Sequence, residues 1–486
     1  MSAWLILVPV LLPVAAGIAL LLLPRIGEKN RRIFLEATVC TASLFTWLLI
    51  LTGPRQVITL YRFIGVFSID FAIDPMTCLF AGMVSVMWPL VMLYAFAYME
   101  HDKWKNTFFA FYVMTYGITL GVAFSASILT LYVFFEMLTL VTIPLVSHYK
   151  NHESMWAARS YAAYLIGGAG LAFAAVILVN IYGNEGIFRY GGSMTVACDP
   201  GLLRIVYVLG FFGFGCKAAV FPLYAWLPRA SVAPTPVTAL LHAVAVVNSG
   251  VFAVTRLTWY SIGTEGIAGT WAQYLPETAA AFTLVFAACM ALKERHFKRR
   301  LAYSTVSNLS YMLFGIALMT PAGLTGGLLH MLFHGIMKMS LFLCAGAFMH
   351  VTGCSYIYEI NGAGRRMPGT FGFYTISALS LTGIPLLCGF VSKWQLLMAG
   401  MQEGSVWSVA GVFCLIVSAF LCAMYTLSVS VRAFFPQRSK DLYVARPEIG
   451  EPPVLMLIPI GIFTAACIVF GIWPAPVVNF LSHLAG

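Results

Sequence analysis

The sequence predicts an all-α polytopic membrane protein with about fourteen transmembrane helices. Of its 486 residues, 60% are hydrophobic and only 9% are charged, whereas a soluble domain carries about 25% charged residues. Apolar windows of about 20 residues, each long enough to cross a hydrocarbon core of about 30 Å, recur along nearly the whole chain. They leave no room for a soluble nucleic-acid-binding domain, so the net charge of +10 does not indicate a nucleic-acid partner.

The apolar windows give the expected helices in chain order. They cover residues 4–24, 33–53, 76–99, 107–124, 128–147, 157–182, 203–227, 237–262, 273–292, 301–320, 324–350, 369–400, 405–434 and 453–480. Between the second and third windows, residues 67–75 alternate apolar and polar side chains, which predicts a short external strand or hairpin.

Lys and Arg residues are concentrated in every second connection between the windows. Counted together with the adjoining ends of the windows, the connections after odd-numbered helices hold 20 of them, and those after even-numbered helices hold 4. Because Lys and Arg are retained on the cytoplasmic side of a membrane, both termini are expected outside. The expected location is the inner (plasma) membrane of a prokaryote, crossed many times by the chain.

Two of the expected helices are interrupted by proline. Residues 203–227 contain Pro222, residues 369–400 contain Pro385, and each of these helices also holds a lysine. Proline inside a span frees backbone groups that neighbouring helices or water must satisfy. The two breaks therefore indicate polar cavities within the bundle.

The interrupted helices lie five spans apart, which predicts an internal repeat. The first copy would comprise the fourth to eighth helices (residues 104–262), and the second the ninth to thirteenth (residues 263–435). Since five is odd, the second copy would be inverted in the membrane, as in many transporters. Residues 1–103, with three helices, and residues 436–486, with the last helix, flank the two copies.

Three ionisable residues lie inside long apolar stretches: Glu136, Lys217 and Lys393. A charge near the middle of a bilayer costs at least about 2.5–3.5 kcal/mol on insertion scales, and such charges usually serve ion or proton movement. If their helices are neighbours, Glu136 would hold Lys217 charged, and separating the two would favour release of the lysine's proton. The alternative is a static buried salt bridge that fixes helix packing.

A second group of titratable residues is His330, His334 and Lys338. Their spacing of four residues places them along one face of a helix at steps of about 6 Å. Histidine changes charge near neutral pH, so the three could relay protons with water between them. A structural, hydrogen-bonded role for one histidine is an alternative, and so is metal ligation, for which the sequence offers no third ligand nearby.

Lys393 follows the second break and is the only charged residue in that helix apart from its ends. It is expected to reach water, a neighbouring chain or the relay, with a snorkelling lysine as the alternative.

In residues 237–262, His242 can titrate, whereas Asn248 cannot and Arg256 stays charged. We therefore expect Arg256 to be structural, pairing with a carbonyl or a carboxylate near the cytoplasmic opening of the bundle or its outer edge.

No cofactor, metal site or catalytic centre is expected in this chain. The eleven cysteines are scattered without a CxxC pair, so neither a disulfide framework nor an iron–sulfur site is indicated. Phosphate-binding loops, nucleophile elbows and HExxH motifs are missing from the sequence.

These residues, in this order, resemble the antiporter-like subunits shared by respiratory complex I, Mrp-type sodium/proton antiporters and energy-converting membrane-bound hydrogenases. The resemblance covers most of the chain, and its most specific part is the run from Trp226 through Val237. It is carried by Phe134–Leu140, Lys217–Pro228, Ala233–Ala243, Lys298–Ser307, His330–Lys338 and Gly383–Lys393.

The resemblance implies two inverted half-channels, each around a broken helix, in a subunit that pumps ions while catalysis sits in partner subunits. Glu136 and Lys217 would form the charge pair, His330, His334 and Lys338 would carry protons across the middle, and Lys393 would pass them on. Many members have a titratable lysine where this chain has Asn248, so the link between Lys217 and His330 is expected to run through His242 or water. No long lateral helix follows the last span, which favours the smaller complex I subunits, the Mrp subunit of similar size or a hydrogenase subunit.

The predicted function is that of a proton-translocating subunit of a redox-driven membrane complex, with a sodium link left open. The expected partners are other membrane subunits, the lipid bilayer and the transported ion. A Mrp-type antiporter subunit driven only by ion gradients is the alternative. A quinone-binding redox subunit is a weaker one, because the sequence shows no cofactor ligands.

Overall fold

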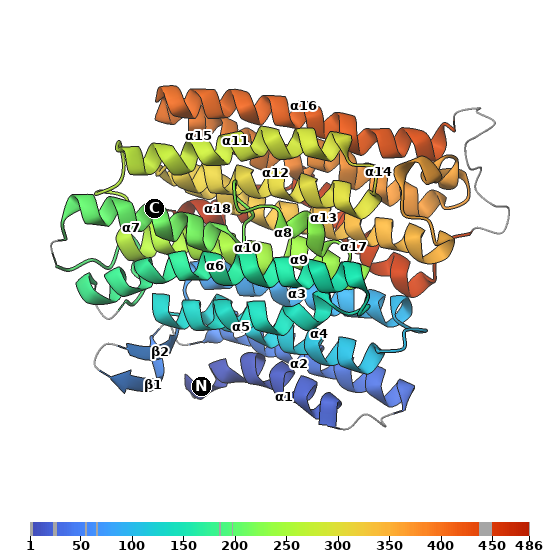
Figure 1. Ribbon diagram of the computed structural model, residues 1–486, viewed down its shortest axis with the longest axis horizontal. Helices are drawn as coiled ribbons and strands as arrows, with labels where there is room; N and C mark the ends of the chain where they lie inside the picture. The colour runs from blue at the N-terminus through green and yellow to red at the C-terminus, as the bar shows by residue number, and fades with distance from the viewer. Residues whose placement is uncertain are drawn as a thin grey trace.

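The structure is a computed structural model that describes residues 3–22, 27–53, 56–64, 67–183, 186–196, 198–436 and 450–485. Its helices run side by side along the long axis of the molecule (Figure 1). In the described part of the chain, eleven helical segments are long and apolar enough to cross a membrane. The prediction of an all-α polytopic membrane protein is confirmed.

Each of the fourteen predicted ranges holds at least one helix. Three of them are not among the eleven apolar segments: the range of α7 (Pro200–Gly215), that of α12 (Phe297–Ala317), and that of α14 (Pro368–Thr382) with α15 (Cys388–Glu403). The first and last of these are broken helices, and α12 begins with a run of basic residues. It stays a prediction that the two repeats are inverted relative to each other. The division of the chain at residues 103, 262 and 435 stays a prediction too.

The chain begins with η1 (Ala3–Leu7), α1 (Val8–Leu22) and α2 (Glu28–Thr52), followed by a two-stranded antiparallel hairpin, β1 (Ile58–Ile64) and β2 (Phe67–Phe71). The strand or hairpin predicted here is confirmed. Asp74 then caps α3 (Pro75–Tyr98) by accepting a hydrogen bond from the Thr77 backbone at 2.7 Å.

The next helices are α4 (Lys105–Phe124), α5 (Ile128–Val146) and α6 (His152–Tyr182). Short polar side chains set where helices begin, because they accept hydrogen bonds from the free N–H groups of the first turn. Ser127 caps α5, Asn151 caps α6 and Asp199 caps α7 in this way.

Both predicted breaks are present. Helix α7 ends at Gly215 and α8 (Trp226–Ala230) follows after a non-helical segment that holds Lys217 and Pro222. The Trp226 indole donates to the Cys216 carbonyl at 2.9 Å and so satisfies an acceptor that the break leaves free. In the second break α14 ends at Gly383, whose φ of 99° suits glycine, and Pro385 lies before α15.

A third break was not predicted. The eighth expected helix is divided into α9 (Thr235–Ala243), α10 (Val246–Thr255) and a π-helical end, η2 (Arg256–Ile262). Neither proline nor glycine lies at Val244 and Ala245 to mark the break. The Asn248 side chain donates to the Ala243 carbonyl at 2.8 Å, which satisfies the acceptor that the interrupted helix leaves free.

Helix α13 (Pro321–Thr352) lies in the middle of the second half and packs against α9, α12, α14, α15 and α17. The remaining helices are α11 (Trp271–Lys293), η3 (Ile357–Ile360), η4 (Ala363–Arg365), α16 (Val406–Phe434), α17 (Val454–Ile472) and α18 (Ala475–Leu484). Apart from its two ends and Leu332, every residue of α13 is buried. Side chains that point from the middle of this helix are therefore shielded from lipid.

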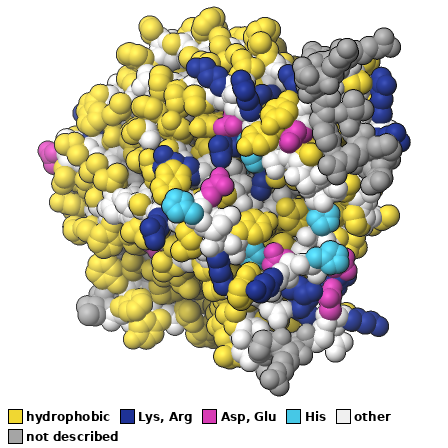
Figure 2. Space-filling model, turned by 45° about the vertical axis from the view of Figure 1, so that its right-hand side comes forward, with side chains coloured by type: hydrophobic (Ala, Val, Ile, Leu, Met, Phe, Trp, Pro, Cys, Tyr) yellow, Lys and Arg dark blue, Asp and Glu magenta, His cyan; other side chains and the backbone are white. Residues whose placement is uncertain are grey.

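Charged side chains gather at one end of the molecule. Figure 2 shows Lys, Arg, Asp, Glu and His together on the end opposite the hairpin, while hydrophobic side chains cover the flank. Ion pairs join Lys105 to Glu28 at 3.1 Å and Arg32 to Glu100 at 3.1 Å in this region. Both chain ends lie towards the hairpin side in Figure 1. We call the two ends the charged end and the hairpin end.

Candidate functional site

The first predicted pair, Glu136 on α5 and Lys217 in the first break, lies close together. The two charges interact, and Lys217 is completely buried. The Lys217 ammonium donates to the carbonyl of Phe135, the residue before Glu136, and lies 3.5 Å from the centre of the Phe135 ring. Among the described residues no ion pair joins Glu136 to Lys217, and one carboxylate oxygen of Glu136 is buried without a hydrogen-bond partner.

The site therefore holds the lysine beside the glutamate without locking the two together. A static salt bridge would need direct contact between ammonium and carboxylate, which this arrangement lacks. A small movement of α5 against the first break would change the distance between the charges. That geometry suits a pair whose separation changes better than a static salt bridge that fixes helix packing.

Helix α10 packs directly against the first break. A Cβ on Gly250 would come within 2.5 Å of the Ala218 backbone nitrogen and 2.9 Å of the Lys217 Cβ, so only glycine allows this approach. Gly335 of α13 likewise lies against the Ala243 carbonyl, at 3.2 Å from where its Cβ would be. The third break thus lies between Lys217 on one side and the His334 segment of α13 on the other.

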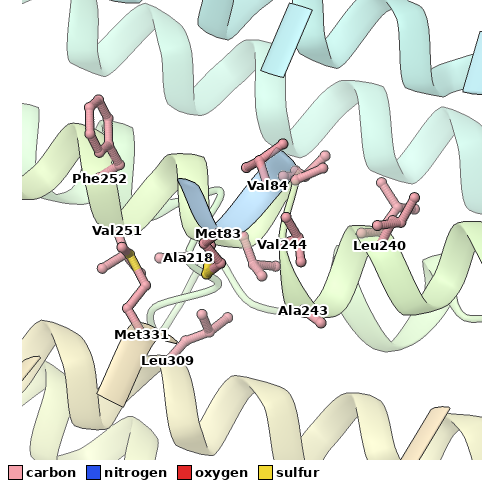
Figure 3. Close-up of a cluster of buried hydrophobic side chains, with 14 of the residues drawn as sticks. Met83, Val84, Ala218, Leu240, Ala243, Val244, Val251, Phe252, Leu309 and Met331 are labelled. Atoms are coloured by element: carbon pink, nitrogen blue, oxygen red, sulfur yellow. The ribbon is translucent and has the colours of Figure 1, made fainter. Parts of the chain in front are cut away.

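An apolar cluster lines this middle region. It consists of Met83, Ala218, Val251, Leu309 and Met331, all of them buried. Figure 3 shows these side chains gathered between α10 and the helices that carry Leu309 and Met331. Hydrophobic constrictions can close a water path by dewetting. The cluster is therefore placed to interrupt water between Lys217 and His330.

His242 lies near the relay on α13. Lys338 and Lys298 are close enough to act on it electrostatically, and its ring lies 4.9 Å from that of Phe342. Both ring nitrogens are buried and have no hydrogen-bond partner in the described part of the chain. A completely buried imidazole with two free nitrogens can accept or donate a proton through water.

The three relay residues follow one face of α13 but differ in how they are held. His330 bonds through both ring nitrogens, to Ser392 at 2.9 Å and to Asn308 at 3.2 Å. Lys338 donates to the Ser304 hydroxyl at 2.7 Å and to the Leu301 carbonyl at 3.1 Å. His334 lies between them, and neither of its ring nitrogens has a partner among the residues the structure describes.

Lys393 points back into the second break. Its ammonium donates to the Leu381 carbonyl at 2.6 Å and to the Thr382 carbonyl at 3.2 Å, the last carbonyls of α14. It also lies 5.0 Å from the centre of the Tyr311 ring, which in turn is 5.2 Å from the ring of His330. Since Lys393 is only 6% exposed, it is not a lysine that snorkels to the membrane surface.

Arg256 forms the structural pair that its sequence position suggested. It donates to Asp74 at 2.8 Å and to the Thr77 hydroxyl at 3.2 Å, which ties η2 to the beginning of α3.

Metal ligation at the histidine pair gains no support, because no group of three His, Cys, Asp or Glu side chains suited to a metal lies within the described ranges.

Lys298 is a buried charge that the sequence reasoning did not assign to the site. It lies on the first turn of α12, lines a cavity of about 180 Å³ at the charged end, and donates to the Ala233 carbonyl at 2.7 Å. Thr238 donates to the same carbonyl at 3.0 Å and lies one helical turn from His242. The sequence did hold a signal for Lys298, because this residue begins the motif Lys298–Ser307.

Glu277 on α11 is the second buried charge that was missed. It is completely buried, and both carboxylate oxygens lack a hydrogen-bond partner in the described structure. The signal was the same as for Glu136, an acidic residue within an apolar window. Together with the residues predicted from the sequence, Lys298 and Glu277 form what we call the row, a set of buried or half-buried titratable side chains.

Residues 125–435 match the family described as NADH:quinone oxidoreductase/Mrp antiporter, TM, and residues 64–109 match the N-terminal segment described for chain 5 of NADH-ubiquinone oxidoreductase (complex I). The chain belongs to the NADH:quinone oxidoreductase/Mrp antiporter family. The predicted resemblance is thereby confirmed, and the matched range contains every residue of the row just described.

Individual relatives within the family differ in what their names say they do. One is a probable K(+)/H(+) antiporter A/B subunit from Rhizobium meliloti, 31% identical over 85% of this chain and 41% of its own length. Another is NADH-quinone oxidoreductase subunit N of Desulforudis audaxviator, 29% identical over 86% of this chain and 85% of its own length. The chain thus spans less than half of the first relative and most of the second.

Solved structures confirm the fold of this family member. A chain of the membrane-bound sulfane sulfur reductase, an archaeal respiratory membrane complex, superposes with a TM-score of 0.86 over 100% of this chain and 97% of its own, at 24% identity. A chain of respiratory complex I from Thermus thermophilus gives a TM-score of 0.82 at 23% identity, over 99% of this chain and 98% of its own.

Proposed function

We propose that this chain is a proton-translocating subunit of a redox-driven complex in the plasma membrane of a prokaryote. The observation that carries the proposal is the row of buried or half-buried titratable side chains on both sides of the apolar cluster, in a member of this family. Seven of them were predicted from the sequence: half-buried Glu136 and the buried residues Lys217, His242, His330, His334, Lys338 and Lys393.

Each group has the chemistry that proton transfer needs. Protons would move through the first half by release from Lys217 when Glu136 moves away. They would cross the middle on His242, His334 and Lys338 through water, and leave through Lys393. Catalysis of electron transfer would belong to partner subunits of the complex.

Lys298 supports a route from the charged end to His242. Water in the cavity that it lines would meet the lysine, and the shared carbonyl of Ala233 connects it to Thr238 on α9. Burial and the neighbouring Lys298 and Arg299 lower the pKa of His296 in the same cavity to about 4, so this histidine is neutral near pH 7. We propose that the charged end faces the cytoplasm, as the excess of Lys and Arg suggests.

A Mrp-type antiporter is the second candidate for the complex that holds this chain, supported by the 31% identity to the Rhizobium meliloti antiporter relative. Purifying a tagged chain from its native membrane distinguishes the two, since the first candidate requires copurifying redox subunits. Sodium in place of protons would show as transport that depends on sodium and resists a protonophore.

The direct test is ion transport in sealed membrane vesicles that carry the assembled complex. Lys217→Ala and Lys393→Ala are each expected to abolish transport while the complex stays assembled on a native gel. Lys29→Ala, which removes an exposed lysine of α2 at the charged end, is the matched control and should transport normally. Normal transport in both buried-lysine variants would show that the proposed mechanism is wrong.

A further inference from the structure

Glu277 is a buried carboxyl that the proposed path does not yet use. It lies on the second turn of α11, is completely buried, and has no hydrogen-bond partner for either oxygen among the described residues. Leaving a buried polar group unpaired is unfavourable, and more so for a charged one. A structural carboxyl would normally be paired, so this one is suited to exchange protons with water.

The packing of α11 against α12 fixes the height of Glu277 in the bundle. Ser307 donates to the Leu284 carbonyl at 2.9 Å, and Gln273 donates to the Leu318 carbonyl at 3.2 Å. Both bonds fit one antiparallel alignment of the two helices, in which each step forward along α11 is a step back along α12. In that alignment Glu277 lies opposite Phe314. That level is three residues of α12, or about 4.5 Å, beyond Tyr311 in the direction of the hairpin end.

Tyr311 connects this level to the proposed path. Its ring lies beside both the Lys393 ammonium and the His330 ring, at 5.0 and 5.2 Å. Its hydroxyl donates to the Leu415 carbonyl of α16 at 2.9 Å. This bond joins α12 to α16 on the charged-end side of Glu277. Glu277 therefore lies on the hairpin-end side of the level at which Tyr311 meets Lys393.

Beyond Glu277 lies Glu403, at the end of α15. The two carboxyl groups are close enough for their charges to interact. Glu403 is partly exposed and accepts a hydrogen bond from the Ser405 backbone at 2.8 Å, next to the beginning of α16. The buried carboxyl thus has a partly exposed one on its outer side, as a path to the surface would require.

We propose that Glu277 is the proton-carrying carboxyl between Lys393 and the hairpin-end surface. The inference rests on the proposed function. In the transfer, the Lys393 ammonium gives one proton through water to the Glu277 carboxylate, which leaves a neutral amine and a neutral carboxylic acid. Glu277 then returns the proton to water beside Glu403, and the reverse sequence serves transport in the other direction.

The test is proton transport in sealed vesicles that carry the assembled complex with Glu277→Gln, a change that keeps size and hydrogen bonding but cannot carry a proton. We expect a loss of about tenfold or more, since a positioned proton-transfer group contributes about 10²–10⁴ in rate. Glu277→Asp, which keeps the carboxyl, should restore most of the rate. Glu265→Gln, an exposed carboxyl at the same end, is the matched control and should change nothing.

Infrared difference spectra provide a second measurement that a structural role would not affect. During transport, a protonated-carboxyl band that shifts in heavy water should be present in the unmodified complex and missing in Glu277→Gln. Lys393→Ala separates the two proposals. If Lys393→Ala abolishes transport and Glu277→Gln transports normally, only the role of Glu277 is wrong. If Lys393→Ala and Lys217→Ala also transport normally, the proposed function itself fails.

Discussion

The imidazole rings of His330 and His334 lie 6.1 Å apart on α13, and the structure holds them in opposite ways. His330 is fixed by Ser392 and Asn308, whereas both nitrogens of His334 are free of partners within the described residues. The alternative that one histidine is structural therefore falls on His330. On the proposed function, His334 would be the better proton carrier, because neither of its nitrogens is bound to another group.

This difference predicts opposite defects in the two variants. His334→Gln should lower transport about tenfold or more, because the positioned proton carrier is lost, while the thermal stability of the complex stays unchanged. His330→Ala should lower stability, since the buried Asn308 amide oxygen loses its partner at about 1–3 kcal/mol. Transport in vesicles and thermal melting of the purified complex measure the two effects. Equal stability losses in both variants would contradict the assignment.

Lys217→Arg tests whether the lysine must lose its proton. Arginine keeps the positive charge beside Glu136 but stays protonated at every accessible pH. We expect assembly to be retained and transport to be lost. Lys293→Arg at the end of α11 makes the same exchange outside the row and should transport normally. Full transport with Lys217→Arg would favour the static pair after all.

Much of the fold could be predicted from the sequence, because a membrane span leaves an apolar window of defined length. The breaks at Pro222 and Pro385 carried their own signal, since proline cannot continue the hydrogen bonding of a helix. The break at Val244 had none. It depends on Asn248 satisfying the Ala243 carbonyl and on the close approach of Gly335, which are tertiary contacts.

The candidate site was predicted as a set of residues but not as a geometry. The spacing of His330, His334 and Lys338 placed them on one helix face, yet nothing in the spacing indicated which of them would be bonded. Lys217 was expected to be a neighbour of Glu136, but the sequence did not indicate that its ammonium would donate to the Phe135 carbonyl. Glu277 and Lys298 were missed because their burial depends on which helices cover α11 and α12.

Asp74 and Arg256 should make the stability of the hairpin end depend on pH. Burial raises the pKa of Asp74, but the Arg256 guanidinium and hydrogen bonds from Thr77 outweigh burial and hold it below its usual value. A lowered pKa stabilises the folded state above the unfolded-state pKa of about 4, and this contribution is lost as the pH falls through the lower folded-state value.

Asp74→Ala should therefore destabilise the protein by about 3 kcal/mol near pH 7, because it leaves Arg256 buried without its carboxylate. The difference from the unmodified protein should shrink in acid. Thermal melting of the purified protein from pH 7 to pH 3 measures it, with Asp199→Ala, an exposed cap at the same end, as the comparison that loses a carboxylate without a buried partner. If the stability difference between Asp74→Ala and the unmodified protein stayed constant across this pH range, the Asp74–Arg256 pair would not be the source of the pH dependence.

The apolar cluster predicts a leak when it is made wettable. Val251→Thr replaces a methyl group by a hydroxyl of nearly the same size within the cluster, so the volume is kept while the polar group favours water between Lys217 and His330. We expect proton leakage through vesicles in the absence of the driving reaction, with transport less tightly coupled to that reaction. Val254→Thr makes the same exchange at a buried position outside the cluster and should stay tight. Equal leakage in the two variants would indicate general loosening of α10, and no leakage in either would mean that the cluster does not control water.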